Sequence, residues 1–171
     1  LTYCIGIRTG WPDENVYLIA FEQAPSIFHF DITEEPFGYV EKGYYFLASL
    51  CKTIIPNSTV YLFLMGGLSM VLLYETLRKY SVIPLLGLCC YISRFLITRD
   101  FIQMRSSLAI LVIIFASKYI YEKKMWKYFA FLLVAYQFHH LALLGIPLYF
   151  INKIHITDKF IVFGLVLALV G

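Results

Sequence analysis

Three arginines fall within twelve residues of one another, at positions 94, 99 and 105. The planar guanidinium fork of arginine matches phosphate oxygens in pairs, so a group of arginines is suited to holding a phosphate or a pyrophosphate. Arg94 interrupts the mainly apolar run 82–98, whereas Arg99 and Arg105 belong to a short polar patch. The alternative interpretation is that these side chains anchor membrane helices at the interface, with Arg94 reaching the headgroups along its own stem.

Two adjacent histidines, His139 and His140, interrupt an apolar run. Neighbours on an α-helix project about 100° apart, whereas histidines that share a metal ion are usually four positions apart, so we expect no metal site. A neutral histidine inside a helix bundle can act as a general base or orient an acceptor hydroxyl. The alternative is a purely structural hydrogen bond between helices.

Carboxylates stand close to aromatic residues in the N-terminal part of the chain. Asp13 comes four residues before Tyr17, and Glu41 comes three residues before Tyr44. Carboxylates accept hydrogen bonds from sugar hydroxyls, and aromatic rings cover the apolar face of a sugar. The pattern is typical of carbohydrate binding, but it is also found on interfacial loops, where tyrosines are common.

These polar residues stand out because charge is scarce. Of the 171 residues, 60% are hydrophobic and 15% are charged, and the mean hydropathy is +0.74. Soluble domains carry about 25% charged residues. So much apolar surface exceeds what one small core can bury, and it predicts an all-α integral membrane protein with a polytopic helical bundle. We expect its surroundings to be membrane lipids and expect no nucleic-acid partner.

Polar residues divide the apolar sequence into five segments that we predict to be membrane helices. They cover residues 58–77, 82–98, 104–121, 128–151 and 159–171. The last is shorter than the roughly 20 residues that a crossing requires, and the first residue is not Met, so we expect a chain truncated at both ends. Residues 1–57 are expected to form an external segment with short amphipathic helices, one of them over 41–55, where apolar residues recur every three or four positions.

The distribution of charge predicts the orientation. Basic clusters at 78–79 and 118–127 are separated by two predicted spans, and basic loops are retained on the cytoplasmic side. By alternation, residues 99–105, residues 152–159 and the N-terminal segment face the outside. Residues 1–43 carry seven acidic against two basic side chains, which agrees with an external location.

Four short motifs follow one another along the chain. An arginine–glycine–aspartate stretch runs from Arg8 to Tyr17, and a glutamate–glycine–tyrosine helix start follows at Glu41. A helix start led by an arginine follows at Arg105, and the last motif is the histidine-containing segment 135–143. In this order the motifs resemble the EpsG family of bacterial polysaccharide polymerases, related in role to Wzy-type O-antigen polymerases. Here Trp11 and Pro12 stand between the glycine and the aspartate of the first motif.

The resemblance implies a metal-independent glycosyltransferase of the bacterial inner membrane, multi-pass, with its active site facing the periplasm or exterior. It would transfer an oligosaccharide from undecaprenyl pyrophosphate to another repeat unit, lengthening O-antigen, capsule or exopolysaccharide. A chain-length regulator would be a further partner, and no cofactor is required.

The same resemblance assigns roles to the residues. Arg105 with Arg99 would hold the pyrophosphate and stabilise the charge that develops as it leaves. His139 would be the base or would orient the acceptor, with Asp13 or Glu41 as the rival base. The other expected substrate-binding residues are Arg94, Arg8, Tyr17, Tyr44 and His140.

Two other classes fit the same residues. A flippase or transporter for lipid-linked glycans would use the arginines to bind phosphate during translocation, although transporters tend to show repeated halves, and none is visible here. A membrane acyltransferase that modifies surface glycans would use the histidine as its catalytic group. Its acyl donor would arrive from the cytoplasmic side, opposite to the expected position of the arginines.

Overall fold

The computed structural model describes residues 1–7, 10–31, 33 and 41–151, and within these it is helical with no strand. The all-α prediction is confirmed for this part of the chain. The elements are α1 (Thr2–Gly6), α2 (Glu14–Gln23), η1 (Ile27–His29), α3 (Gly43–Ile54), α4 (Ser58–Tyr80), α5 (Pro84–Tyr91), η3 (Ile92–Ile102), α6 (Met104–Ala116), α7 (Lys118–Tyr121), α8 (Met125–Tyr136), η4 (His140–Leu144) and α9 (Gly145–Ile151).

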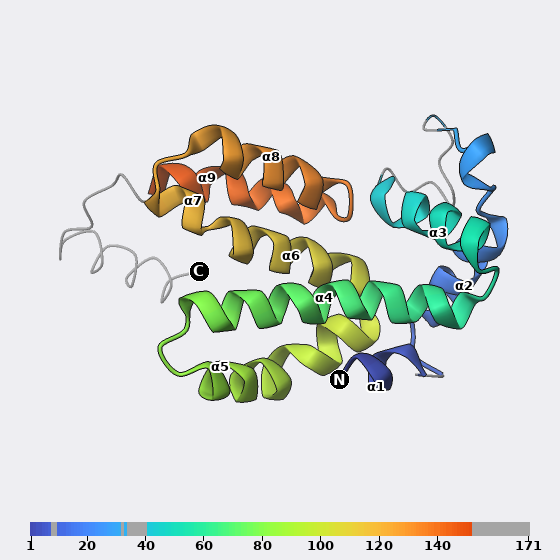
Figure 1. Cartoon of the computed structure of the whole chain (residues 1–171), viewed down its shortest axis with the longest axis horizontal. Helices are drawn as coiled ribbons and strands as arrows, with labels where there is room; N and C mark the ends of the chain where they lie inside the picture. The colour runs from blue at the N-terminus through green and yellow to red at the C-terminus, as the bar shows by residue number, and fades with distance from the viewer. Residues whose placement is uncertain (8–9, 32, 34–40, 152–171) are drawn as a thin grey trace, which may run out of the picture.

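The 23-residue helix α4 runs along the length of the molecule, and the other elements lie around it (Figure 1). The Asn57 side chain caps it by accepting a hydrogen bond of 2.8 Å from the Thr59 N–H, and two basic residues occupy its last turn, where the helix dipole favours cations. Among the described helices, α4 and the stretch Met104–Tyr121 are long and apolar enough to cross a membrane. They coincide with the helices predicted over 58–77 and 104–121.

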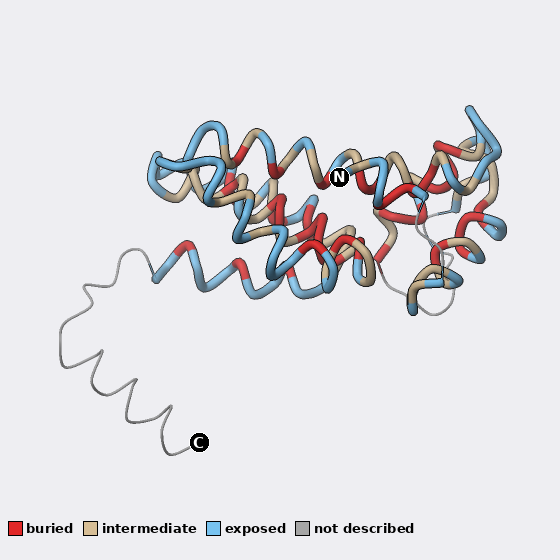
Figure 2. The backbone as a smooth tube through the Cα atoms, turned by 90° about the horizontal axis from the view of Figure 1, so that it is seen from below, coloured by how far each residue is buried: buried red, intermediate tan, exposed pale blue. Residues whose placement is uncertain are grey.

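The core lies where α4 and α6 face one another. Leu62 and Met65 of α4 are buried together with Leu108 of α6, and the outward sides of these helices are exposed (Figure 2). The exposed sides carry large apolar residues, such as Val71 at 60% exposure. A face of this kind is suited to contact with lipid.

Helix α1 also lies against α4, although residues 1–57 were predicted to be external. The two helices approach closely because each has a glycine at the contact. A Cβ on Gly6 would lie 2.5 Å from the Phe63 ring, and a Cβ on Gly66 would lie 2.8 Å from Ile5. Small residues allow helix backbones to come this close. Residues 1–57 therefore do not form one separate segment, because α1 packs on a candidate membrane-spanning helix.

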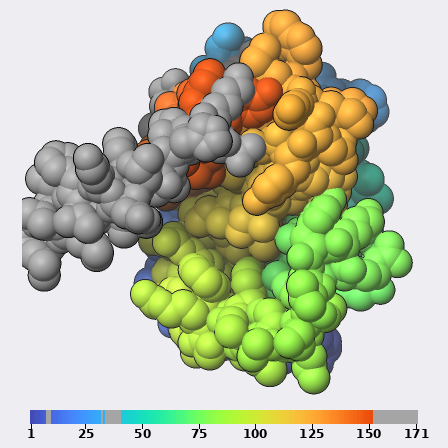
Figure 3. Space-filling view, turned by 90° about the vertical axis from the view of Figure 1, so that its left-hand side faces the viewer, coloured from blue at the N-terminus to red at the C-terminus, as the bar shows by residue number. Residues whose placement is uncertain are grey.

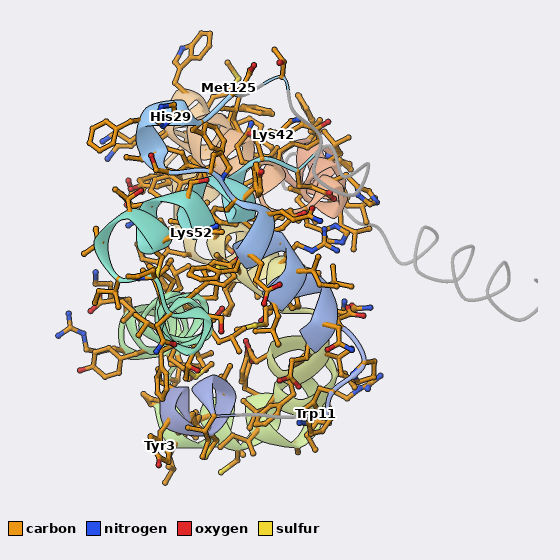
Figure 4. The ribbon with its side chains drawn as sticks, turned by 90° about the vertical axis from the view of Figure 1, so that its right-hand side faces the viewer. Tyr3, Trp11, His29, Lys42, Lys52 and Met125 are labelled. Carbon is orange, nitrogen blue, oxygen red and sulfur yellow. The ribbon has the colours of Figure 1, made fainter. Side chains whose placement is uncertain are left out.

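Helices α2 and α3 lie together at one end of α4 (Figure 4). The Lys52 ammonium of α3 donates to the carbonyl oxygens of Glu22 (2.6 Å) and Ala24 (2.7 Å), which the end of α2 leaves without helical partners. Before α2, the Trp11 ring contacts Phe101 of η3 at 5.1 Å between centroids. The amphipathic helix predicted over 41–55 is present as α3.

The predicted helix over 82–98 is longer in the structure and changes its winding. Helix α5 begins with Pro84 at its first position, which suits proline because no helical hydrogen bond is required of it there. From Ile92 to Ile102 the chain continues as η3, an eleven-residue π-helix. π-helices are rare, usually a single turn, and are frequent at functional sites.

Residues 125–151 form a helical hairpin, which corrects the single helix predicted over 128–151. Helix α8 ends at Tyr136, and η4 and α9 return along it (Figure 1). The Tyr128 hydroxyl donates to the Gly145 carbonyl at 2.6 Å, and its ring lies 5.6 Å from that of Tyr149. Hydrophobic periodicity does not show such a turn, because apolar residues continue on both sides of it.

Both ends of the hairpin lie at the end of the molecule where α4 ends and the lysine-rich turn after α7 is found (Figures 1 and 3). Its tip points to the opposite end, toward α3. The sequence predicted that the chain leaves this apolar run on the side opposite to 118–127. In the structure Ile151 lies at the same end as that cluster, and the predicted elements over 152–159 and 159–171 lie outside the described residues.

The tip of the hairpin docks on the N-terminus of α3, where only glycine fits. The Gly43 N–H donates to the Gln137 carbonyl at 2.6 Å, and a Cβ on Gly43 would lie 2.7 Å from that oxygen. We predict that Gly43→Ala lowers the free energy of unfolding by about 1–3 kcal/mol, because the tip must move away. Denaturant unfolding in detergent micelles measures this. Gly67→Ala is the control, since its new Cβ would meet nothing closer than 3.7 Å; equal losses from the two variants would contradict the docking.

Candidate functional site

The buried carboxylate of Glu41 joins three segments of the chain. Its Oε1 accepts hydrogen bonds from the Nδ1 of His140 at 2.9 Å and from the backbone N–H of His140 at 3.4 Å. Its Oε2 lies 3.6 Å from a guanidinium nitrogen of Arg105. The Glu41 side chain is only 7% exposed. This one group therefore ties the start of α3 to the hairpin tip and to the start of α6.

The electrostatics of Glu41 favour its ionised form. Burial alone would raise the pKa of its carboxyl, but the hydrogen bonds from His140 and the charge of Arg105 outweigh burial and hold the pKa below its ordinary value. The group is therefore a carboxylate at neutral pH.

Arg105 is enclosed by two tyrosines rather than open to a ligand. Its guanidinium carbon lies 4.9 Å from the ring centroid of Tyr44 and 5.9 Å from that of Tyr17, distances at which a cation is attracted to the ring face. Its backbone N–H donates to the Tyr17 hydroxyl at 3.4 Å. Both rings are buried, so the structure uses them to cover Arg105 and not as the open sugar platforms that the sequence predicted.

The first motif contains the charged residues Asp13 and Arg8. Asp13 comes directly before α2, and its side chain caps no N–H there. It acts on Tyr17, whose pKa is raised by burial and further by Asp13, while Arg105 opposes the rise. Arg8 lies outside the described residues.

The π-helix η3 presents Arg94 and Arg99 to a cavity of about 550 Å³. Arg99 donates to the Gln103 side chain at 2.8 Å and to the Ser106 hydroxyl at 3.3 Å. The other lining residues are Phe95, Thr98, Ile102, Gln103 and Leu141. Because Leu141 follows the two histidines, the hairpin tip forms part of the cavity wall. The three arginines predicted to act together are thus divided, with two at the cavity and Arg105 in the tyrosine pair.

A second buried carboxylate, Asp100, was not singled out from the sequence. It is 1% exposed and accepts hydrogen bonds from the hydroxyls of Ser107 (2.6 Å) and Tyr91 (2.5 Å). The Ser107 contact ties the π-helix to α6, and the Tyr91 contact ties it to the end of α5, at the residue next to Arg99. In the sequence, Asp100 could have been noticed as the acidic residue in a segment whose other charges are basic. Its hydroxyl partners, however, are 7 and 9 residues away and follow no motif.

Glu41, His139 and His140 also have the composition of a metal site, with one ligand atom from each within 4.8 Å of the others. No metal site was predicted from the sequence, because adjacent histidines on a helix point in different directions. In the structure the turn at the hairpin tip places the two ring centroids 4.5 Å apart. Two imidazoles and a carboxylate suit zinc or iron. The guanidinium of Arg105 beside the carboxylate opposes a further cation, however, and therefore favours proton chemistry at this site.

Over the described residues, the fold is all-helical with two candidate membrane-spanning helices, and it carries a histidine-containing site near an arginine-lined cavity. A family model, that of the EpsG family, matches residues 1–171, and the chain therefore belongs to the EpsG family. This is a family of Wzy-like polymerases, which confirms the resemblance drawn from the four motifs. No curated protein and no solved structure matches the chain.

The lowered pKa of Glu41 predicts how stability depends on pH. A carboxyl whose pKa is lower in the folded state contributes stability above its unfolded value, near 4.3, and loses it as the pH falls through the folded value. The wild-type thermal midpoint should therefore fall on acidification through that range. Glu41→Gln should be less stable at pH 7 and should lose less between pH 5 and 3, as measured by thermal unfolding. Glu22→Gln, at an exposed position, is the control; parallel curves for wild type and Glu41→Gln would contradict the role of this carboxylate.

Proposed function

We propose that this chain polymerises lipid-linked oligosaccharide repeat units into a surface polysaccharide, which is O-antigen, capsule or exopolysaccharide. Membership of the EpsG family supports the polymerase class. The observation that carries the donor chemistry is the cavity lined by Arg94 and Arg99, whose wall includes Leu141, the residue that follows the two histidines. We assign undecaprenyl pyrophosphate as the carrier of the donor.

The cavity has the properties that a pyrophosphate-linked sugar requires. Its volume of about 550 Å³ is in the ordinary range for small-molecule sites. Two guanidinium groups bind the phosphate oxygens and stabilise the negative charge that develops on the leaving group. The Gln103 amide holds Arg99 in place through its 2.8 Å hydrogen bond. In this proposal the arginines neutralise the leaving group and no metal ion is needed.

The membrane orientation follows from charge. Lysines gather where α4 ends and α7 gives way to α8: Lys79 at the end of α4 and Lys118 of α7 lie 5.9 Å and 4.3 Å from the Phe115 ring. Basic loops face the cytoplasm, so α2, α3 and the site lie toward the exterior of the inner membrane. The two arms of the hairpin, Met125–Tyr136 and His140–Ile151, are each about 18 Å long, against a hydrocarbon core of roughly 30 Å. We therefore describe this segment as re-entrant and not as a span.

Substitution of the cavity arginines tests the proposal. Arg94→Gln and Arg99→Gln should leave a folded, membrane-inserted protein but reduce polymer formation by about 10²–10³-fold, because the leaving-group charge is no longer stabilised. Gel analysis of the surface polysaccharide measures chain length in a strain that depends on the variant. Arg78→Gln is the matched control, since Arg78 is exposed and pairs with Glu75 at the far end of α4. Wild-type chain lengths from the double variant would refute the donor site.

The same gel separates the three function classes. A polymerase defect reduces the ladder to single repeats, whereas a flippase defect removes all surface glycan. An acyltransferase defect leaves the chain length unchanged and alters the mass of the repeat. Coexpression with a chain-length regulator, the partner that we propose, should narrow the length distribution of the wild-type product.

A further inference from the structure

The hydrogen bonds at the hairpin tip determine which ring nitrogen of His139 carries the proton. The backbone N–H of Leu141 donates to its Nδ1 at 3.1 Å. Because a backbone N–H keeps its proton, Nδ1 must present its lone pair, and the neutral ring is protonated at Nε2. The Nε2 of His139 is therefore a hydrogen-bond donor.

His140 is held in the opposite form. Its Nδ1 lies 2.9 Å from Oε1 of Glu41, which is ionised and has no proton to donate. The proton of this bond is therefore on Nδ1, and Nε2 carries the lone pair. A carboxylate on the far nitrogen is also what fixes the tautomer of the base in a serine protease triad. The His140 side chain is 68% exposed, so its Nε2 is accessible.

The two rings lie next to each other, with centroids 4.5 Å apart, and so present one donor and one acceptor together. A sugar hydroxyl needs this combination, because its oxygen accepts one hydrogen bond and its proton donates another. We infer that the pair binds the acceptor hydroxyl of the incoming glycan, with His140 as the catalytic base, His139 as the donor and Glu41 as a positioning residue. This inference rests on the proposed function.

The reaction follows from these roles. The acceptor oxygen forms a bond to the anomeric carbon of the donor sugar, and its proton passes to the Nε2 of His140. The bond between the anomeric carbon and the pyrophosphate oxygen breaks, and the pyrophosphate leaves with the electron pair. Its charge is held by Arg94 and Arg99. The Glu41 carboxylate stabilises the imidazolium that His140 becomes, and it stays ionised itself.

The sequence favoured His139 as the base, but the hydrogen bond that His139 makes is inconsistent with that role. With Nδ1 occupied by a backbone N–H and Nε2 already protonated, His139 has no free lone pair for a proton. Of the two rival bases, Asp13 and Glu41, the side chain of Glu41 is 7% exposed and already accepts a hydrogen bond from His140. The arrangement leaves His140 as the base at the tip.

Nitrogen NMR of the full-length protein with ¹⁵N-labelled histidine tests the tautomers without any substrate. His139→Gln and His140→Gln assign the two signals, and His29→Gln, at an exposed position on η1, is the control. We expect His140 protonated at Nδ1 and His139 protonated at Nε2. The reverse assignment would overturn the inference. So would one bound zinc ion per chain that is lost in His140→Gln.

Kinetics with purified protein and lipid-linked repeat units test the roles. His140→Gln should lower kcat by about 10²–10⁴-fold with little change in the acceptor KM, whereas His139→Gln should mainly raise that KM. Added imidazole should partly restore His140→Gly, a rescue that a merely structural role would not show. Glu41→Gln should keep measurable activity with a reduced kcat.

The outcomes separate the two proposals. If the wild-type protein forms no polymer from lipid-linked repeats, the proposed function fails, whatever the tautomers are. If it polymerises and His140→Gln keeps the wild-type kcat, the proposed function stands and the assignment of the base is wrong. Loss of kcat in His139→Gln alone would likewise overturn the assignment.

Discussion

The negative charge of a carboxylate buried in a largely apolar bundle must be compensated by opposite charge and hydrogen bonds. The site is organised around the groups that do this for Glu41. Removing an ionised group from water costs several kcal/mol unless opposite charge and hydrogen bonds replace the lost hydration. Arg105 supplies the charge and His140 supplies the hydrogen bonds. Since these residues come from α6 and from the hairpin tip, satisfying Glu41 also decides where both elements sit.

Two tyrosines in turn stabilise the positive charge of Arg105. Arg105 would itself be costly to bury, and the rings of Tyr17 and Tyr44 reduce that cost by covering the guanidinium with their negative faces. The contacts link α2 and α3 to the start of α6. On the other side, Asp100 ties the π-helix to α6 through the Ser107 hydroxyl and to the end of α5 through the Tyr91 hydroxyl, next to Arg99 in the chain. The cavity is thus bounded by elements that buried polar contacts hold in register.

Local patterns in the sequence were sufficient for much of this structure. The apolar stretch at 58–77 and the three- and four-residue spacing at 41–55 correspond to α4 and α3. Motif order predicts functional roles for Arg105, Glu41 and His140, and the structure places both Arg105 and His140 against Glu41. Their family was recognised for the same reason.

The rest depended on contacts between distant residues. The pairing of Glu41 with His140 joins positions 99 residues apart, and no local pattern encodes it. The turn at the tip falls between two apolar stretches, so hydrophobic periodicity does not reveal it. Tyr17 and Tyr44 were assigned to sugar binding because composition does not distinguish an exposed ring from one that covers a buried cation. The contacts of Asp100 within the π-helix involve hydroxyls 7 and 9 residues away, which only the three-dimensional structure brings together.

The hairpin bears on how apolar runs are counted in this chain. A helix that crosses a membrane changes the side on which the next loop lies, whereas a hairpin that enters and returns leaves it unchanged. Counting 125–151 as one crossing therefore reverses the parity for everything after Ile151. Under the proposed re-entrant placement the number of apolar runs differs from the number of crossings, and only the number of crossings decides which compartment a later loop faces.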